Sequence, residues 1–201
     1  SFWSDQRTRF DGRVLAQGGV SGGDGGRVEV SGRTQLQFDG DVLAGASRGL
    51  AGQLLLDPAN LLVVSTGGEA SLPAAASTAD HSIRAAAINR QLANGTSVTL
   101  QATQDIGIAA GAVIDARLAN GGTPGAGLTL AAGRDIAVDG LVILDRGNFT
   151  ASAGRDFTQA DVAAIATQGG AVSVQAGRTL TASNLLGIST VALQSTSGAV
   201  R

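Results

Sequence analysis

The sequence of 201 residues lacks several residue types on which enzymes and metal sites depend. It has no cysteine, which excludes disulfides, thiolate metal sites and a cysteine nucleophile. His81 is the only histidine, so a cluster of histidine ligands is excluded and no Ser-His-Asp set can be argued from spacing. Trp3 is the only tryptophan and tyrosine is absent, whereas sugar-cleaving grooves usually need aromatic platforms. We therefore expect a protein that is not an enzyme, with no catalytic residues and with neither a metal nor a cofactor.

The chain also lacks a strong charge of either sign and a long apolar run. It carries 14 basic and 16 acidic residues, a net charge of −2, and no basic block. We therefore expect no nucleic-acid partner. No stretch approaches the roughly 18 apolar residues of a membrane-spanning helix, so we expect no membrane span.

The chain does contain a short sequence motif that recurs in its C-terminal half. The copies are VTLQATQDIGI from Val98, LTLAAGRDIAV from Leu128, FTASAGRDFTQ from Phe149, VSVQAGRTLTA from Val172 and a fainter VALQSTSGAV from Val191. A repeat of this length is one turn of a winding chain. The 30 glycines suit a fold that turns often. Three short strands in about 20 residues predict an all-β parallel β-helix, in which equivalent strands of successive coils pair.

Aligning the copies separates an inner from an outer face, because side chains alternate along a strand. The predicted core column is Val98, Leu128, Phe149, Val172 and Val191. The predicted outer column beside it, which should face solvent, is Thr99, Thr129, Thr150, Ser173 and Ala192. A second strand should add Ile106, Ile136, Phe157 and Leu180 to the core. Equivalent residues of successive copies are therefore expected to lie above one another.

The rest of the chain divides into two further regions. Residues 1–65 are expected to form glycine-rich coils, with strands at 13–16, 27–30, 35–38, 53–56 and 61–64. Residues 66–95 break the pattern and are expected to form an irregular insert outside the coils. Within this insert, Ser82–Leu92 predicts a short protruding helix, which Asp80 or Ser82 would cap and Asn94-Gly95 would end. We expect His81 in this insert to face solvent. Residues 96–201 are the regular coils.

One charged column invites a chemical interpretation. Its members are Asp105, Asp135 and Asp156, and Arg134, Arg155 and Arg178 occupy the position just before this column. On a β-helix such residues serve calcium-dependent removal of a proton from a uronic acid, as in polysaccharide lyases. The alternative, which we favour, is structural: each carboxylate accepts bonds from turn amides, and the arginines balance the charge.

Three segments carry a family resemblance. They are FWSDQRTRFDGRVLAQGGVSGGDGGRVEVSG from Phe2, LQFDGDVLAGASRGLAGQLLLDPANLLV from Leu36 and INRQLANGTSVTLQATQDIGI from Ile88. Together they closely resemble the filamentous haemagglutinin-like exoproteins, the haemagglutinin-repeat adhesins exported by two-partner secretion. The resemblance implies a right-handed parallel β-helix that an outer-membrane β-barrel transporter exports unfolded. It also implies a secreted or cell-surface location and a part in cell adhesion and virulence.

The resulting expectation is that residues 1–201 form a single β-helix segment of a longer exoprotein, the non-enzymatic shaft of a bacterial adhesin. Its receptor would be an unknown molecule or glycan on a host or bacterial cell. The stalk of a contact-dependent growth-inhibition toxin would share this sequence pattern. A β-helix enzyme acting on polysaccharides is the remaining alternative, and it needs an Asp/Arg cluster exposed in a groove.

Overall fold

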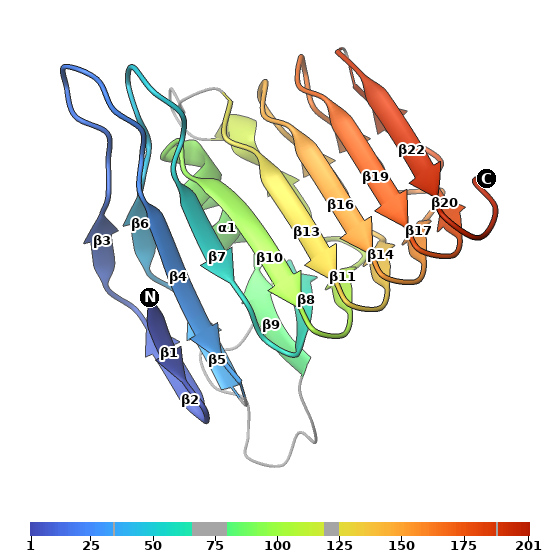
Figure 1. Cartoon of the computed structure of the whole chain (residues 1–201), viewed down its shortest axis with the longest axis horizontal. Coiled ribbons are helices and arrows are strands. Elements are labelled where there is room, and N and C mark those ends of the chain that lie inside the picture. Colours follow the sequence, from blue (N-terminus) through green and yellow to red (C-terminus); the bar gives the residue numbers. More distant parts are fainter. Residues whose placement is uncertain (34, 66–79, 119–124, 188) are drawn as a thin grey trace.

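The computed structural model describes residues 1–33, 35–65, 80–118, 125–187 and 189–201. Within these ranges the chain is mostly strand, with one α-helix and one 3-10 helix. The paired strands run parallel, and each pairs with its counterpart in a neighbouring pass of the chain. Figure 1 shows these passes side by side from the N-terminal to the C-terminal end, with the two termini at opposite ends of the molecule. The expected all-β class with parallel sheets is confirmed.

Three sheets and two strand pairs make up the described part of the chain, and the sheets are numbered from the largest to the smallest. Sheet 1 consists of β1 (Phe2–Ser4), β4 (Arg27–Gly32), β7 (Gln53–Leu56), β10 (Ser97–Ala102), β13 (Leu128–Ala132), β16 (Phe149–Ala153), β19 (Val172–Ala176) and β22 (Val191–Ser195). Sheet 2 consists of β20 (Leu180–Thr181), β17 (Phe157–Gln159), β14 (Ile136–Val138), β11 (Ile106–Ile108), β8 (Asn60–Val64) and β9 (Asp80–Arg84). Sheet 3 consists of β12 (Val113–Asp115), β15 (Leu141–Ile143), β18 (Ala164–Ala166) and β21 (Leu185–Leu186). The pairs are β2 (Arg7–Phe10) with β5 (Gln35–Phe38), and β3 (Arg13–Leu15) with β6 (Asp41–Leu43).

The predicted core column is confirmed residue by residue. Val98 pairs with Leu128, Leu128 with Phe149, Phe149 with Val172, and Val172 with Val191. The first four side chains are fully buried, whereas Val191 on the last strand of sheet 1 is 43% exposed. The predicted second column is confirmed as well, through the pairs between β11, β14, β17 and β20. Aliphatic side chains stacked in this way form one continuous core.

The N-terminal region follows the same order with looser spacing. Its predicted strands agree with β3, β4, β5, β7 and β8 to within two residues at either end. Phe10 stacks on Phe38 of the next coil, with ring centroids 5.7 Å apart. Glycine allows the turns above these strands to approach closely, since a Cβ at Gly25 would lie 1.8 Å from the carbonyl oxygen of Ala44. Figure 1 shows these turns at the upper left, above β3, β4 and β6.

The insert differs from its prediction. The part at 66–79 lies outside the described residues. Residues Asp80–Arg84 form a strand, β9, rather than the start of a helix, and β9 pairs with β8 from Asn60 to Val64. Helix α1 therefore begins later than predicted and spans Ala85–Ala93. Its N-cap is Arg84, with no capping side-chain hydrogen bond, so the prediction of Asp80 or Ser82 as the cap is wrong.

For residues 80–95, the expectation of a protrusion is also wrong. One face of α1 is buried and joins the core through Ala85, Ala87, Ile88 and Leu92. The helix contacts both β6 and β12, and it lies behind sheet 1 in Figure 1. The predicted end of the helix is confirmed, because Asn94 is the C-cap and Gly95 has a φ of 73°.

His81 corrects a further expectation. It is 3% exposed rather than facing solvent, because β9 aligns it with the buried Leu61. Together with Leu36, Phe38 and Ile83 it lines a small pocket between β5 and β9. A strand that is added to a sheet inherits the inside and outside of the strand that it pairs with.

Candidate functional site

The predicted charged column lies at the turn between sheet 1 and sheet 2. Two of these turns place a glycine, an arginine and an aspartate in sequence, Gly133-Arg134-Asp135 and Gly154-Arg155-Asp156, and the following turn has Gly177-Arg178 before a threonine. A Cβ at Gly154 would lie 2.2 Å from the carbonyl oxygen of Gly133 in the preceding coil, and a Cβ at Gly177 would lie 2.1 Å from that of Gly154. The turns therefore need glycine in order to stack at this distance. This close approach brings charged side chains of successive coils together.

Each arginine pairs with the aspartate of the preceding coil, rather than with its own neighbour in sequence. The guanidinium Nε of Arg155 donates to Oδ1 of Asp135 at 3.0 Å, and its second nitrogen donates to Oδ2. The same two-pronged contact joins Arg134 to Asp105 and Arg178 to Asp156. We call these six residues the Arg–Asp column. Such fork-shaped pairs are the most directional ion pairs that proteins form.

Each carboxylate in the column also accepts a backbone hydrogen bond. Oδ1 of Asp105 accepts the N–H of Asp135 at 3.1 Å, and Oδ1 of Asp135 accepts that of Asp156 at 3.2 Å. At the end of the column, Asp156 accepts the N–H of Thr179 at 3.0 Å. One aspartate therefore binds both the turn backbone and the arginine of the following coil.

Uncharged residues begin this column on the N-terminal side. Oδ1 of Asn60 accepts the N–H of Asp105 at 3.1 Å, as the aspartates do further along. Its amide nitrogen lies 3.5 Å from Oε1 of Gln104, which occupies the arginine position. This pair was not predicted from the sequence. Asn60 directly precedes Leu61, Gln104 stands two positions before Ile106, and Leu61 and Ile106 pair in register.

The electrostatics follow from these contacts. The hydrogen bonds from Arg134 and Arg155 lower the pKa of Asp105 and Asp135 below its usual range. The hydrogen bond from Arg178 lowers the pKa of Asp156 to about 2. In return, Asp135 raises the pKa of Arg155. Every acid in the column is thus ionised at neutral pH, and every arginine is engaged by a carboxylate.

A second set of polar residues, which the sequence analysis also missed, surrounds helix α1. The helix occupies the position between β6 and β12 where a strand would otherwise pair with both. The buried Gln91 accepts the N–H of Val42 at 2.7 Å and donates to the carbonyl oxygen of Gly40 at 3.0 Å. Thr96 accepts the N–H of Ala44 at 2.8 Å and donates to the carbonyl oxygen of Val42 at 2.9 Å. These side chains complete the hydrogen bonds of β6.

Asn89 forms the corresponding hydrogen bonds with β12, on the other side of helix α1. Its Oδ1 accepts the N–H of Asp115 at 2.9 Å, and its Nδ2 donates to the carbonyl oxygen of Val113 at 3.1 Å. On the β6 side, Arg90 pairs with Asp39 at 2.8 Å. The segment INRQLANGT therefore links one part of the stack to the next.

The predicted outer threonine column is aligned as expected but is not exposed throughout. Thr99, Thr129 and Thr150 pair in register, yet Thr99 is only 8% exposed. The side-chain amide of Gln53 covers it by donating to its hydroxyl. Within this column Thr99 on β10 is therefore covered, whereas Thr150 on β16 is exposed.

Comparison with known protein families and curated proteins gives no match. In the part of the chain that the structure describes, no helix is long and apolar enough to cross a membrane. Among the same residues, no three His, Asp or Glu side chains gather into a group that could hold a metal ion.

Proposed function

We propose that this chain is a right-handed parallel β-helix and serves as a shaft segment of a secreted bacterial adhesin. The observation that carries the proposal is the stacking of sheet 1. Eight parallel strands follow one another in chain order, and like residues pair in register from β10 to β22. Each coil contacts mainly its neighbours, which is the arrangement of a quasi-one-dimensional rod.

A rod of this kind fits export by two-partner secretion, which the family resemblance implies. The chain has no disulfide to form, and each folded coil offers an open sheet edge to the next. Coils that fold outside the cell cannot slide back through a transporter, so folding would assist export. The partner during export would be an outer-membrane β-barrel, and the location would be the cell surface or the medium.

The Arg–Asp column supports a structural role in this proposal. Its carboxylates hold the arginine and the backbone of the following coil, as a device for alignment would. The alternative of a polysaccharide-acting enzyme needs an arginine free to take a proton, and these arginines are paired. A toxin stalk would have the same shaft, and it differs from an adhesin only in what the shaft carries.

Export provides the test. The chain would be placed between a two-partner secretion domain and a reporter, and surface display of the reporter would be measured with and without the matching β-barrel transporter. We expect transporter-dependent display, and an elongated particle by small-angle scattering of the purified chain. Retention of the fusion in the periplasm with the transporter present, or a compact scattering profile, would contradict the proposal.

A further inference from the structure

The outer face of sheet 1 at its N-terminal strands carries an exposed aromatic side chain. Trp3 on β1 pairs with Ser31, while its neighbour Phe2 pairs with the buried Val30. Because side chains alternate along a strand, Trp3 points away from the core. It is 59% exposed. An exposed tryptophan on a flat sheet provides a platform for a ring or a cation, since its face attracts both C–H groups and positive charge.

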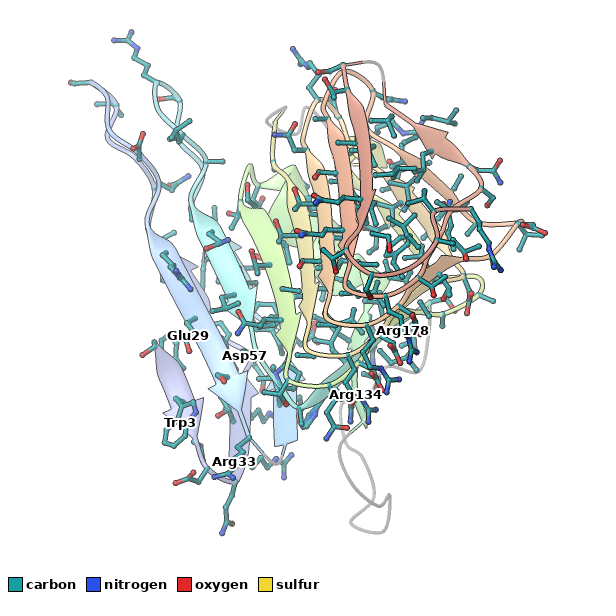
Figure 2. All side chains as sticks on the ribbon, turned by 45° about the vertical axis from the view of Figure 1, so that its right-hand side comes forward. Trp3, Glu29, Arg33, Asp57, Arg134 and Arg178 are labelled. Carbon is teal, nitrogen blue, oxygen red and sulfur yellow. The ribbon has the colours of Figure 1, made fainter. Side chains whose placement is uncertain are left out.

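Two carboxylates lie on the same face. Glu29 on β4 pairs with the outward Leu55, and Asp57 follows two residues later on the same face. Among the described residues neither carboxylate forms an ion pair, in contrast to the acids of the Arg–Asp column. Burial, followed by the nearby charge of Glu29, raises the pKa of Asp57. Figure 2 shows Trp3, Glu29 and Asp57 on adjacent strands of this sheet.

Among the described residues, the nearby basic side chains form no ion pair with these two carboxylates. Arg27 projects from β4 on the same face, two residues before Glu29, and forms no ion pair among the described residues. Arg33, beyond the end of β4, lies 3.9 Å from Asp5, and both are largely exposed. Two acids that repel each other therefore face one unengaged guanidinium, and an added positive charge would relieve their repulsion.

A row of hydrogen-bonding groups crosses the strands beside the tryptophan. Ser31 donates its hydroxyl to the carbonyl oxygen of Asp57 at 2.9 Å, and the side-chain amide of Gln101 lies 3.5 Å from Oδ2 of Asp57. Trp3, Ser31 and Gln101 thus lie on β1, β4 and β10, and Asp57 lies at the residue after β7, between Ser31, which is buried, and Gln101. At about 4.8 Å between strands, the row is about 14 Å long. It runs along the stack, from one strand to the next.

We propose that this face, hereafter the Trp3 face, binds a linear glycan whose sugars carry free amino groups. The indole of Trp3 would stack on one pyranose ring, Glu29 and Asp57 would take the ammonium groups, and Gln101 would bind hydroxyls further along. Acidic glycans are repelled by the carboxylate pair. A lysine-rich peptide shares the positive charge, but it loses rotamer freedom on binding, whereas rigid sugar rings present hydroxyls to the row with little loss of freedom. The proposal does not depend on the shaft function.

The single tryptophan makes the test direct, because intrinsic fluorescence reports on this face alone. The whole chain would be titrated with glucosamine oligomers, with their N-acetylated forms, with oligogalacturonate and with a lysine-rich peptide. The pH would keep both the amines and Asp57 charged. We expect a saturable fluorescence change with glucosamine oligomers, weaker binding of the N-acetylated forms and no binding of oligogalacturonate.

Variants locate the site by calorimetry. We expect Trp3→Ala, and separately the pair Glu29→Gln with Asp57→Asn, to weaken glucosamine-oligomer binding about tenfold. Asp139→Asn removes an exposed carboxylate away from this face and should leave the affinity unchanged. Circular dichroism would verify that each variant is folded. The proposal is overturned if the oligomers do not bind, if oligogalacturonate or the peptide binds as tightly, or if Trp3→Ala has no effect.

Discussion

The regular coils from Ser97 onward and the junction around helix α1 satisfy the hydrogen bonds of their strand edges in different ways. In the regular coils each strand edge is satisfied by an equivalent strand, so Leu128 lies between Val98 and Phe149 with no special residue required. At the junction a helix takes the place of a strand, and the edges of β6 and β12 would lack partners. There Gln91 and Asn89 supply the missing donors and acceptors. Repetition suffices where strand follows strand, whereas an interruption needs individual polar side chains.

The largest effect should come from the regular coils. Phe149 is fully buried between Leu128 and Val172, so Phe149→Ala should leave a cavity and lower the free energy of unfolding by about 3–5 kcal/mol. Urea unfolding followed by circular dichroism measures this change. Val191→Ala, in the same column but 43% exposed, should cost much less. Equal losses at both positions would show that burial within the stack does not determine stability here.

The junction should be nearly as sensitive, but for a polar reason. Gln91→Leu preserves size while leaving the N–H of Val42 and the carbonyl oxygen of Gly40 without these partners in a buried position. Unsatisfied buried groups cost about 1–3 kcal/mol each, so we expect a loss of about 2–4 kcal/mol. Hydrogen exchange should also show faster exchange at Val42. The matched control is Gln101→Leu, since Gln101 is exposed, and a similar loss there would contradict the role of Gln91.

These two regions also differ in how far their structure could be predicted from the sequence. Where coils repeat, aligned copies identify the core because parallel in-register pairing places like residues together. The columns from Val98 and Ile106 were therefore predicted correctly. What alignment within single coils did not reveal is the offset by which Arg155 binds Asp135 instead of Asp156.

The insert could not be predicted in the same way, because its structure depends on distant strand edges. Residues Asp80–Arg84 have the composition of a helix start, but they form a strand since β8 offers an edge for pairing. That pairing shifts the start of α1 and buries His81, contrary to prediction. Similarly, Gln91 resembles any polar helix residue until β6 lies beside it. Tertiary contacts decided each case against local preference.

Acid should weaken the regular coils through the Arg–Asp column. The pKa of Asp105, Asp135 and Asp156 is lower in the folded chain than the ordinary value of 3.8, so the unfolded chain binds more protons between the two values. The stabilisation by these acids is therefore fully present above about pH 5 and is lost as the pH falls towards 2, where Asp156 titrates.

Removing one charge from the column isolates this contribution. Asp135→Asn retains Oδ1 as an acceptor for the N–H of Asp156 but removes the ion pair with Arg155. Because the pair is partly exposed and screened by water, we expect a decrease in melting temperature of only about 1–3 °C at pH 7. Melting curves from pH 2 to pH 6 should show a shallower acid dependence than wild type. An unchanged slope would mean that Asp135 does not contribute to the acid sensitivity.

The smallest effect has the opposite sign and sets the Trp3 face apart from the Arg–Asp column. Burial and Glu29 raise the pKa of Asp57, so ionisation of this carboxyl opposes folding, and its destabilising effect develops as the pH rises through the folded pKa. Asp57→Asn should therefore raise the melting temperature by about 1 °C at pH 7, with little change at pH 3. A lower melting temperature at pH 7 would show that the carboxylate stabilises the fold. Retaining an acid that destabilises the sheet is understandable if its charge is used by a ligand, because functional sites commonly keep groups that reduce stability.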